Sequence, residues 1–319
     1  MKSVSQLTDF YYKELYPDLQ KLEEQRLKIK KRLINIGILY LIVVVIIAFI
    51  IYKNFSIEVL FFYTIVALAG IKLIQNYLMK DYSVDFKDKI IAPLISAIDP
   101  NLNYRPFSHI SKNDFINSKL FEKHIDRMSG NDYVHGSIDD INIQFSDLLV
   151  EKKHKDSKGR EVWERVFEGL FIVSEFPKNF YGQTIILPDS AQKIFGNLIG
   201  NWLQSNNFSR DQLVKMDNIS FEKEFVVYSS DQIEARYILT PSLMQKLLDY
   251  KKKTKHPLYI SFIGGKIYMA IEYNDDMFEA SLFHSLLEYK IAMQYIQTLH
   301  LAIGIVEELK LNQKLWSKR

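Results

Sequence analysis

The feature that most constrains this chain is a pair of long apolar runs close to its N-terminus. The first run, Leu33–Tyr52, holds 20 residues without a charge. As a helix it extends about 30 Å, which matches the hydrocarbon core of a bilayer. A secretory signal peptide is disfavoured because the run starts 33 residues into the chain and no small-residue cleavage site follows it. The run therefore predicts a transmembrane helix.

A second apolar run, Phe55–Ile71, follows almost at once and contains one charge, Glu58, near its start. The polar link Lys53–Ser56 is long enough only for a turn, so the two runs predict an antiparallel transmembrane hairpin over residues 33–72. A buried core helix is the alternative for the second run. A single span, however, would place the N-terminus and the bulk of the chain on opposite sides of the membrane.

Basic residues flank the hairpin asymmetrically. Ten lie outside the two spans, against Lys53 alone in the link: Lys21, Arg26, Lys28, Lys30, Lys31, Arg32, Lys72, Lys80, Lys87 and Lys89. Lys and Arg accumulate on the cytoplasmic side of membrane proteins, so both termini are predicted to face the cytoplasm.

Residues 1–32 predict a juxtamembrane helix with one apolar stripe. The stripe consists of Leu15, Leu19, Leu22, Ile29 and Leu33, which recur at helical spacing. Either it packs against another helix, or the segment is a solvated extension of the first span. Both alternatives stay open on the sequence.

Residues 80–319 mix strand and helix patterns. Ile141–Lys153 and Glu161–Phe176 read as long strands around a charged turn, which predicts a β-hairpin. Gly264-Gly265 indicates a second hairpin, and an apolar stripe starting near Met277 indicates a long C-terminal helix. Strands and helices do not alternate regularly, so the predicted class of this cytoplasmic domain is α+β with a mostly antiparallel sheet.

One short predicted helix carries the best candidate site. Asp231, with Glu234 three residues later, has the spacing of a capping box, and Arg236 and Tyr237 lie on the same first turns. In a functional interpretation these four side chains bind a ligand or a partner. In the structural alternative, Asp231 and Glu234 cap the helix, Arg236 closes an internal ion pair and Tyr237 is part of the core.

Two basic clusters are candidates for contact with anionic lipid headgroups. They are Lys30, Lys31 and Arg32 before the first span, and Lys152, Lys153 and Lys155 at the turn of the first predicted β-hairpin. Each Lys or Arg close to an anionic surface can gain about 1 kcal/mol. Simple solvation is the alternative for both clusters.

Several function classes are disfavoured by composition and motifs. Forty-one basic residues against 38 acidic ones give a net charge of +3, too balanced for a dedicated nucleic-acid binder. The chain has no cysteine, which removes thiolate catalysis and cysteine metal sites. It has no phosphate-binding loop, dinucleotide fingerprint or nucleophile elbow, and its seven histidines lack zinc-site spacing. We therefore predict no catalytic residue, metal or cofactor.

Three neighbouring stretches carry a family resemblance: residues 221–225, 228–232 and 234–243. Their sequences, FEKEF, YSSDQ and EARYILTPSL, are similar to the signature of an uncharacterised bacterial family known as domain of unknown function 3137. Weaker similarity extends over nearly the whole chain. The resemblance implies a membrane-anchored bacterial protein of the inner membrane, supplies no activity, and suggests a small membrane protein of the LemA type as a partner.

These observations favour a membrane-tethered binding or scaffold module that forms homo-oligomers through its terminal helices. The alternative is a membrane-associated enzyme with an unfamiliar site near Asp231–Tyr237. Transport is disfavoured because two spans without charges away from their ends form no pathway in a single copy.

Overall fold

The computed structural model describes residues 3–54, 57–121, 124–138, 141–175, 180–189, 213–254, 256–273 and 278–288, together with Met293 and Ile296. These residues fall into two compact units. The first contains the described residues up to Ile98 and those from Phe278 to Ile296, and the second contains the described residues from Asp99 to Tyr273.

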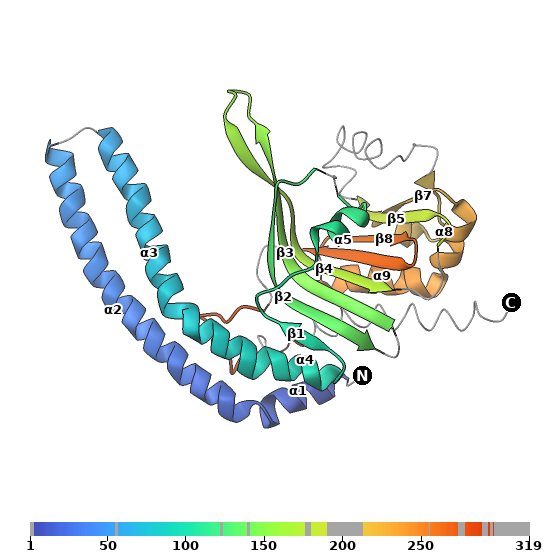
Figure 1. Cartoon of the computed structure of the whole chain (residues 1–319), viewed down its shortest axis with the longest axis horizontal. Coiled ribbons are helices and arrows are strands. Elements are labelled where there is room, and N and C mark those ends of the chain that lie inside the picture. The colour runs from blue at the N-terminus through green and yellow to red at the C-terminus, as the bar shows by residue number, and fades with distance from the viewer. Residues whose placement is uncertain are drawn as a thin grey trace. The chain divides into compact units, whose positions relative to one another are not determined.

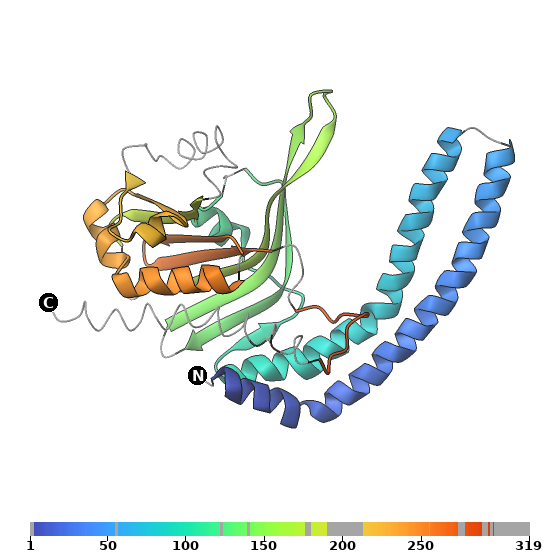
Figure 2. The same cartoon turned by 180° about the vertical axis from the view of Figure 1, so that it is seen from behind.

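The first unit is built on a helical hairpin. Helices α2 (Tyr16–Asn54) and α3 (Ile57–Phe86) run side by side, and α3 continues through the π-helical turn η1 (Lys87–Ile91) into α4 (Ala92–Ile98) (Figures 1 and 2). The single helix expected over residues 1–32 is instead two, because α1 (Val4–Lys13) ends shortly before Pro17. A proline ring clashes with the carbonyl four residues earlier, so it is accommodated in the first turn of α2.

Both long helices are apolar enough to cross a membrane, judged by length and composition. In the most apolar stretch of α2 no residue is buried, and in that of α3 only 6% are, which does not fit a soluble core helix. Two tyrosines join the helices: the Tyr40 hydroxyl donates to the Ala67 carbonyl at 2.9 Å, and that of Tyr63 donates to the Val44 carbonyl at 3.2 Å.

The base of the hairpin is the end that holds the first turns of α2 and the π-helical turn η1. It buries charged side chains as well as apolar ones. Leu19 and Leu22 of the predicted stripe are buried, so this part of the stripe packs within the chain. Arg26 is also buried, pairs with Glu23 at 2.6 Å, and donates to the carbonyl of Leu282 at 2.7 Å. The base therefore holds a segment from far along the sequence.

That segment differs from the expectation of a long helix starting near Met277. Residues 278–288 form turns and bends, because their polar groups bond to α1, α2 and η1. The Leu286 carbonyl accepts from Tyr11, its amide donates to Glu23, and Glu279 pairs with Lys87. The rest of the expected helix, apart from Met293 and Ile296, lies outside the described residues.

The second unit is an α+β domain, as predicted. Its described strands form one antiparallel sheet of nine in the order β1-β2-β3-β4-β9-β8-β5-β7-β6. The strands are β1 (Asn103–Arg105), β2 (Arg127–Ile138), β3 (Ile141–Lys155), β4 (Glu161–Glu175), β5 (Gln183–Pro188), β6 (Leu213–Val214), β7 (Phe225–Ser229), β8 (Leu258–Ile263) and β9 (Lys266–Glu272). Both predicted hairpins, β3–β4 and β8–β9, are present.

Short helices complete this unit: α5 (Lys112–Asn117), α7 (Ile219–Glu222), α8 (Gln232–Ile238) and α9 (Pro241–Thr254). Phe115 of α5 packs against Phe167 and Phe171 of β4, with ring centroids 6.0 and 5.2 Å apart, so α5 covers part of one sheet face. The far ends of β3 and β4 project beyond the other strands as an arm (Figure 1). The part of this sheet face that is not under α5 carries polar side chains.

Candidate functional site

Strand register gathers polar side chains on one face of the sheet. His135 of β2 lies opposite Gln144 of β3, which lies opposite Val173 of β4. Two residues further along, Asn142 of β3 donates to Glu175 of β4 at 2.7 Å, and Glu175 lies opposite Lys266 of β9. Alternate residues of a strand point to the same face, so these two rows of side chains share one surface.

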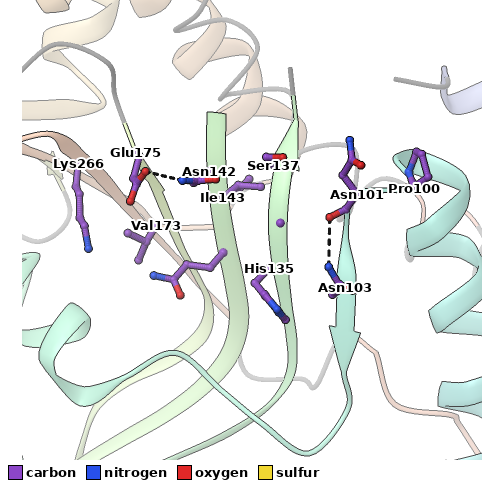
Figure 3. A pocket seen from close by; sticks show the side chains of 12 residues that line it. Pro100, Asn101, Asn103, His135, Ser137, Asn142, Ile143, Val173, Glu175 and Lys266 are labelled. Carbon is purple, nitrogen blue, oxygen red and sulfur yellow. Dashed lines mark hydrogen bonds between the residues drawn. The ribbon is translucent and has the colours of Figure 1, made fainter. Parts of the chain in front are cut away.

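The rows line a pocket of about 650 Å³ (Figure 3). Its wall is completed by the segment that leads into β1, where Asn101 lies between Pro100 and Ser137 of β2. Asn103 of β1 lies opposite His135. Gly136 allows this approach, because a Cβ there would overlap the backbone carbonyl oxygen of Asn101. The pocket lining is Pro100, Asn101, Asn103, His135, Gly136, Ser137, Asn142, Ile143, Gln144, Val173, Glu175 and Lys266.

His135 is one of three titratable residues in the lining, together with Glu175 and Lys266. Its ring stacks on that of Tyr133, with centroids 5.1 Å apart and planes 13° apart. Its Nδ1 atom is buried and has no hydrogen-bond partner among the described residues. Burial, and then the charge of Arg105, lower the pKa of His135 from 6.5, so the neutral imidazole dominates at neutral pH.

The surrounding groups are already oriented by bonds within the protein. The Tyr133 hydroxyl donates to Oε1 of Gln144 at 2.8 Å, which leaves the amide nitrogen of Gln144 as a donor. The Lys266 ammonium contacts Asp114 of α5 at 3.0 Å. Burial by itself lowers the pKa of Lys266, but the hydrogen bond and charge of Asp114 outweigh it and the pKa is raised. One edge of the pocket is therefore formed by a lysine that is held by a carboxylate of α5.

The predicted site on α8 is organised differently from the expected capping box. Asp231 caps the helix, as predicted, by accepting from the amides of Ile233 and Glu234 at 2.9 and 3.0 Å. Glu234 does not complete the box: its two carboxylate oxygens accept from the amides of Tyr181 and Gly182 at 2.9 and 2.8 Å. Two hydrogen bonds to one carboxylate stabilise this arrangement more than the single bond of a capping box would. Glu234 therefore holds the turn before β5.

The other two predicted residues face outward. Arg236 donates to the carbonyls of Gln232 and Lys215 at 3.3 and 3.5 Å, and it makes no ion pair with the described residues. Tyr237 is 58% exposed rather than in the core, and Ile233 one turn earlier is 69% exposed. None of the four predicted residues lines the pocket described above. The predicted site is therefore a structural contact between α8 and the turn before β5, with Arg236 and Tyr237 exposed beside it.

The basic cluster on the β3–β4 arm is largely paired with acids. Lys152 lies 3.4 Å from Glu164, and Lys153 lies 2.7 Å from Glu161. Lys155 is exposed at the end of β3. Acidic partners weaken the attraction of this cluster to anionic lipid, whereas Lys31 and Arg32 are exposed on α2 beside its apolar stretch.

Sequence reasoning missed the pocket, although one signal pointed to it. The alternation of Ile141, Ile143 and Phe145 places Asn142 and Gln144 on the opposite face, where an amphipathic strand normally meets solvent. The partners of these residues on β2, β4 and β9 depend on register and could not be read from one strand. Among the described residues no group of three or more His, Asp or Glu could hold a metal ion.

Comparison with known proteins gives one family match, which covers part of the chain. Residues 165–311 match the model of the family described as "Protein of unknown function (DUF3137)", which confirms the resemblance over that stretch. No curated protein matches the chain. Among solved structures, the mycobacterial trehalose monomycolate transport factor A, TtfA, is similar at 6% identity over 69% of this chain and 93% of its own, with a TM-score of 0.30.

Proposed function

We propose that this chain is a membrane-tethered binding module of the bacterial inner membrane. Helices α2 and α3 cross the bilayer as a hairpin, and both termini and the sheet domain lie in the cytoplasm. The apolar surface of the two helices carries this proposal, because large side chains such as Leu39, Phe61 and Leu68 are exposed. Isolated exposed apolar residues are ordinary, but a continuous surface along two long helices requires lipid or protein around it.

The absence of cysteine makes the topology directly testable. Asn54→Cys places a thiol at the end of α2 beside the link, and Lys158→Cys places one in the turn of the β3–β4 arm. We expect a membrane-impermeant maleimide to label Asn54→Cys in intact spheroplasts and Lys158→Cys only after lysis. The reverse pattern, or equal labelling of both before lysis, contradicts the proposal. The cysteine-free parent protein is the background control.

Binding of partners follows from the same proposal. The headgroup contacts of Lys30, Lys31 and Arg32 and the partner of LemA type are expectations that co-purification with lipid and protein can test. The expected homo-oligomer is part of the proposal as well. Its interface must use surfaces other than Leu19 and Leu22, since these are buried within the chain. Native mass spectrometry of the protein in nanodiscs gives the number of copies directly.

The rival function is a membrane-associated enzyme with its site near Asp231–Tyr237. It has less support, because the carboxylates of Asp231 and Glu234 accept backbone amides that account for both residues structurally. Arg236 and Tyr237 lie on an exposed surface, which suits a contact with another macromolecule better than an enclosed reaction site.

A further inference from the structure

We propose that the polar pocket on β2, β3, β4 and β9 binds a neutral polyhydroxylated small molecule, a saccharide or a polyol. This inference rests on the proposed binding role and names the chemistry of one ligand. The pocket volume of about 650 Å³ lies within the range of roughly 300–1,000 Å³ that is typical of small-molecule sites.

The side chains of the pocket offer hydrogen bonds that the protein leaves unused. The Nδ1 of His135 is buried without a partner among the described residues, so the hydrogen bond to a bound molecule falls to Nε2, which is not among the buried unpartnered atoms. Gln144 uses its oxygen to hold Tyr133, and its amide nitrogen remains as a donor. His135 and Gln144 are direct neighbours across β2 and β3, so one bound molecule can reach both.

Charge in the pocket is balanced, which selects against ions. Among the lining residues the charged ones are Glu175 and Lys266, of opposite sign and opposite each other in register. Each is already bonded, Glu175 to Asn142 and Lys266 to Asp114. Burial and Arg105 lower the pKa of His135, so its imidazole is neutral and adds no charge to the pocket. Two acids, Asp114 and Glu175, act on Lys266, and the charge of Arg105 acts on His135, so two negative and two positive charges surround the pocket and an ion would meet no net counter-charge.

Hydroxyl groups fit this lining better than a peptide does. A hydroxyl both donates and accepts, and amide and imidazole groups of the kind seen here complement both roles. The pocket lies on a sheet face between paired strands, so a peptide could not add to the sheet through its backbone. Val173 and Pro100 supply apolar contact for the C–H faces of a sugar ring.

Binding can be measured by saturation-transfer NMR and calorimetry on the full chain in nanodiscs. Maltose, sucrose and sorbitol are the neutral probes, and glucose 6-phosphate and glucosamine are charged counterparts of similar size. We expect at least one neutral probe to bind, and both charged counterparts to bind more weakly. His135→Phe keeps the stacked ring but removes its nitrogens, and Gln144→Leu removes the amide. Each should weaken binding about tenfold.

Gln245→Leu, on the exposed side of α9, is the matched control and should leave binding unchanged. Circular dichroism and thermal unfolding confirm that each variant is folded. The proposal is overturned if no neutral probe binds, if a charged counterpart binds more tightly, or if folded His135→Phe and Gln144→Leu bind like the parent. The cysteine labelling reports topology independently, so failure of either proposal is distinguishable from failure of the other.

Discussion

Gly70 of α3 makes room for the phenol of Tyr40 between the two long helices. A Cβ at position 70 would overlap the Tyr40 hydroxyl oxygen, whose hydrogen is donated to the Ala67 carbonyl. In lipid, where helices gain little from the hydrophobic effect, such close contacts at small residues and such hydrogen bonds hold a hairpin together.

Gly70→Leu is therefore expected to push Tyr40 out of its position and break its bond to Ala67. Overpacking of a close contact costs about 1–3 kcal/mol, so the first unit should unfold at lower temperature in nanodiscs. Gly37→Leu is the control, because a Cβ at Gly37 meets nothing within 4 Å. Equal stability of the two variants would show that the Tyr40 contact contributes little.

Arg26→Met tests the buried ion pair at the base of the hairpin. The substitution leaves the Glu23 carboxylate and the Leu282 carbonyl without their strongest donor. Removing one partner of a buried pair costs about 3–5 kcal/mol, and we expect a loss near the lower end because Glu23 also accepts from Leu286. Chemical denaturation measures the loss, and Lys28→Met on the exposed side of the same helix should show none.

The same pair predicts a loss of stability in acid. Burial raises the pKa of Glu23, but hydrogen bonds from Arg26 and Ser285 outweigh it, so the folded-state pKa lies below 4.5. The stabilisation is complete above pH 4.5 and is lost as the pH falls through the lower, folded-state value. Denaturation midpoints of the parent and of Glu23→Gln, measured across this window, should converge at low pH. Parallel curves would contradict the prediction.

His135 predicts a second pH effect, in a milder range. Its folded-state pKa is lowered from 6.5 by burial and by Arg105, so the unfolded chain binds the proton more readily. The resulting stability is present above pH 6.5 and declines as the pH falls through the folded-state pKa. His135→Phe should flatten this decline. NMR titration of the ring protons of His135 gives the pKa directly, and a value above 6.5 would contradict the assignment.

Glu234→Gln tests the junction between α8 and the turn before β5. An amide side chain offers one oxygen where the carboxylate offers two, so one of the amides of Tyr181 and Gly182 loses its acceptor. We expect faster hydrogen exchange at these two amides and a loss of about 1–2 kcal/mol. Glu224→Gln, an exposed carboxylate on the same unit, should change neither. Unchanged exchange in Glu234→Gln would show that the turn is held by other contacts.

Periodicity and turn chemistry predicted most of the elements, because these signals are local. The spacing of apolar residues in α2 and α3, the glycine pair at Gly264 and the cap at Asp231 each act within a few residues. The partner of Glu234, by contrast, lies 52 residues away at Gly182, and no local pattern encodes it. The pocket required the register of four strands, and the turns at 278–288 required the groups of the hairpin base that bind them.

The bond from Arg26 to Leu282 spans 256 residues of sequence, which has a consequence for the order of assembly. During synthesis the two long helices emerge first, while the segment that completes their base is made only after all nine described strands of the sheet. Until then the guanidinium of Arg26 lacks its carbonyl partner, and closing so long a loop is slow. The base of the hairpin is thus the last part of the first unit to form. A ribosome that stops before residue 278 releases a chain in which Arg26 has no Leu282 carbonyl to bind.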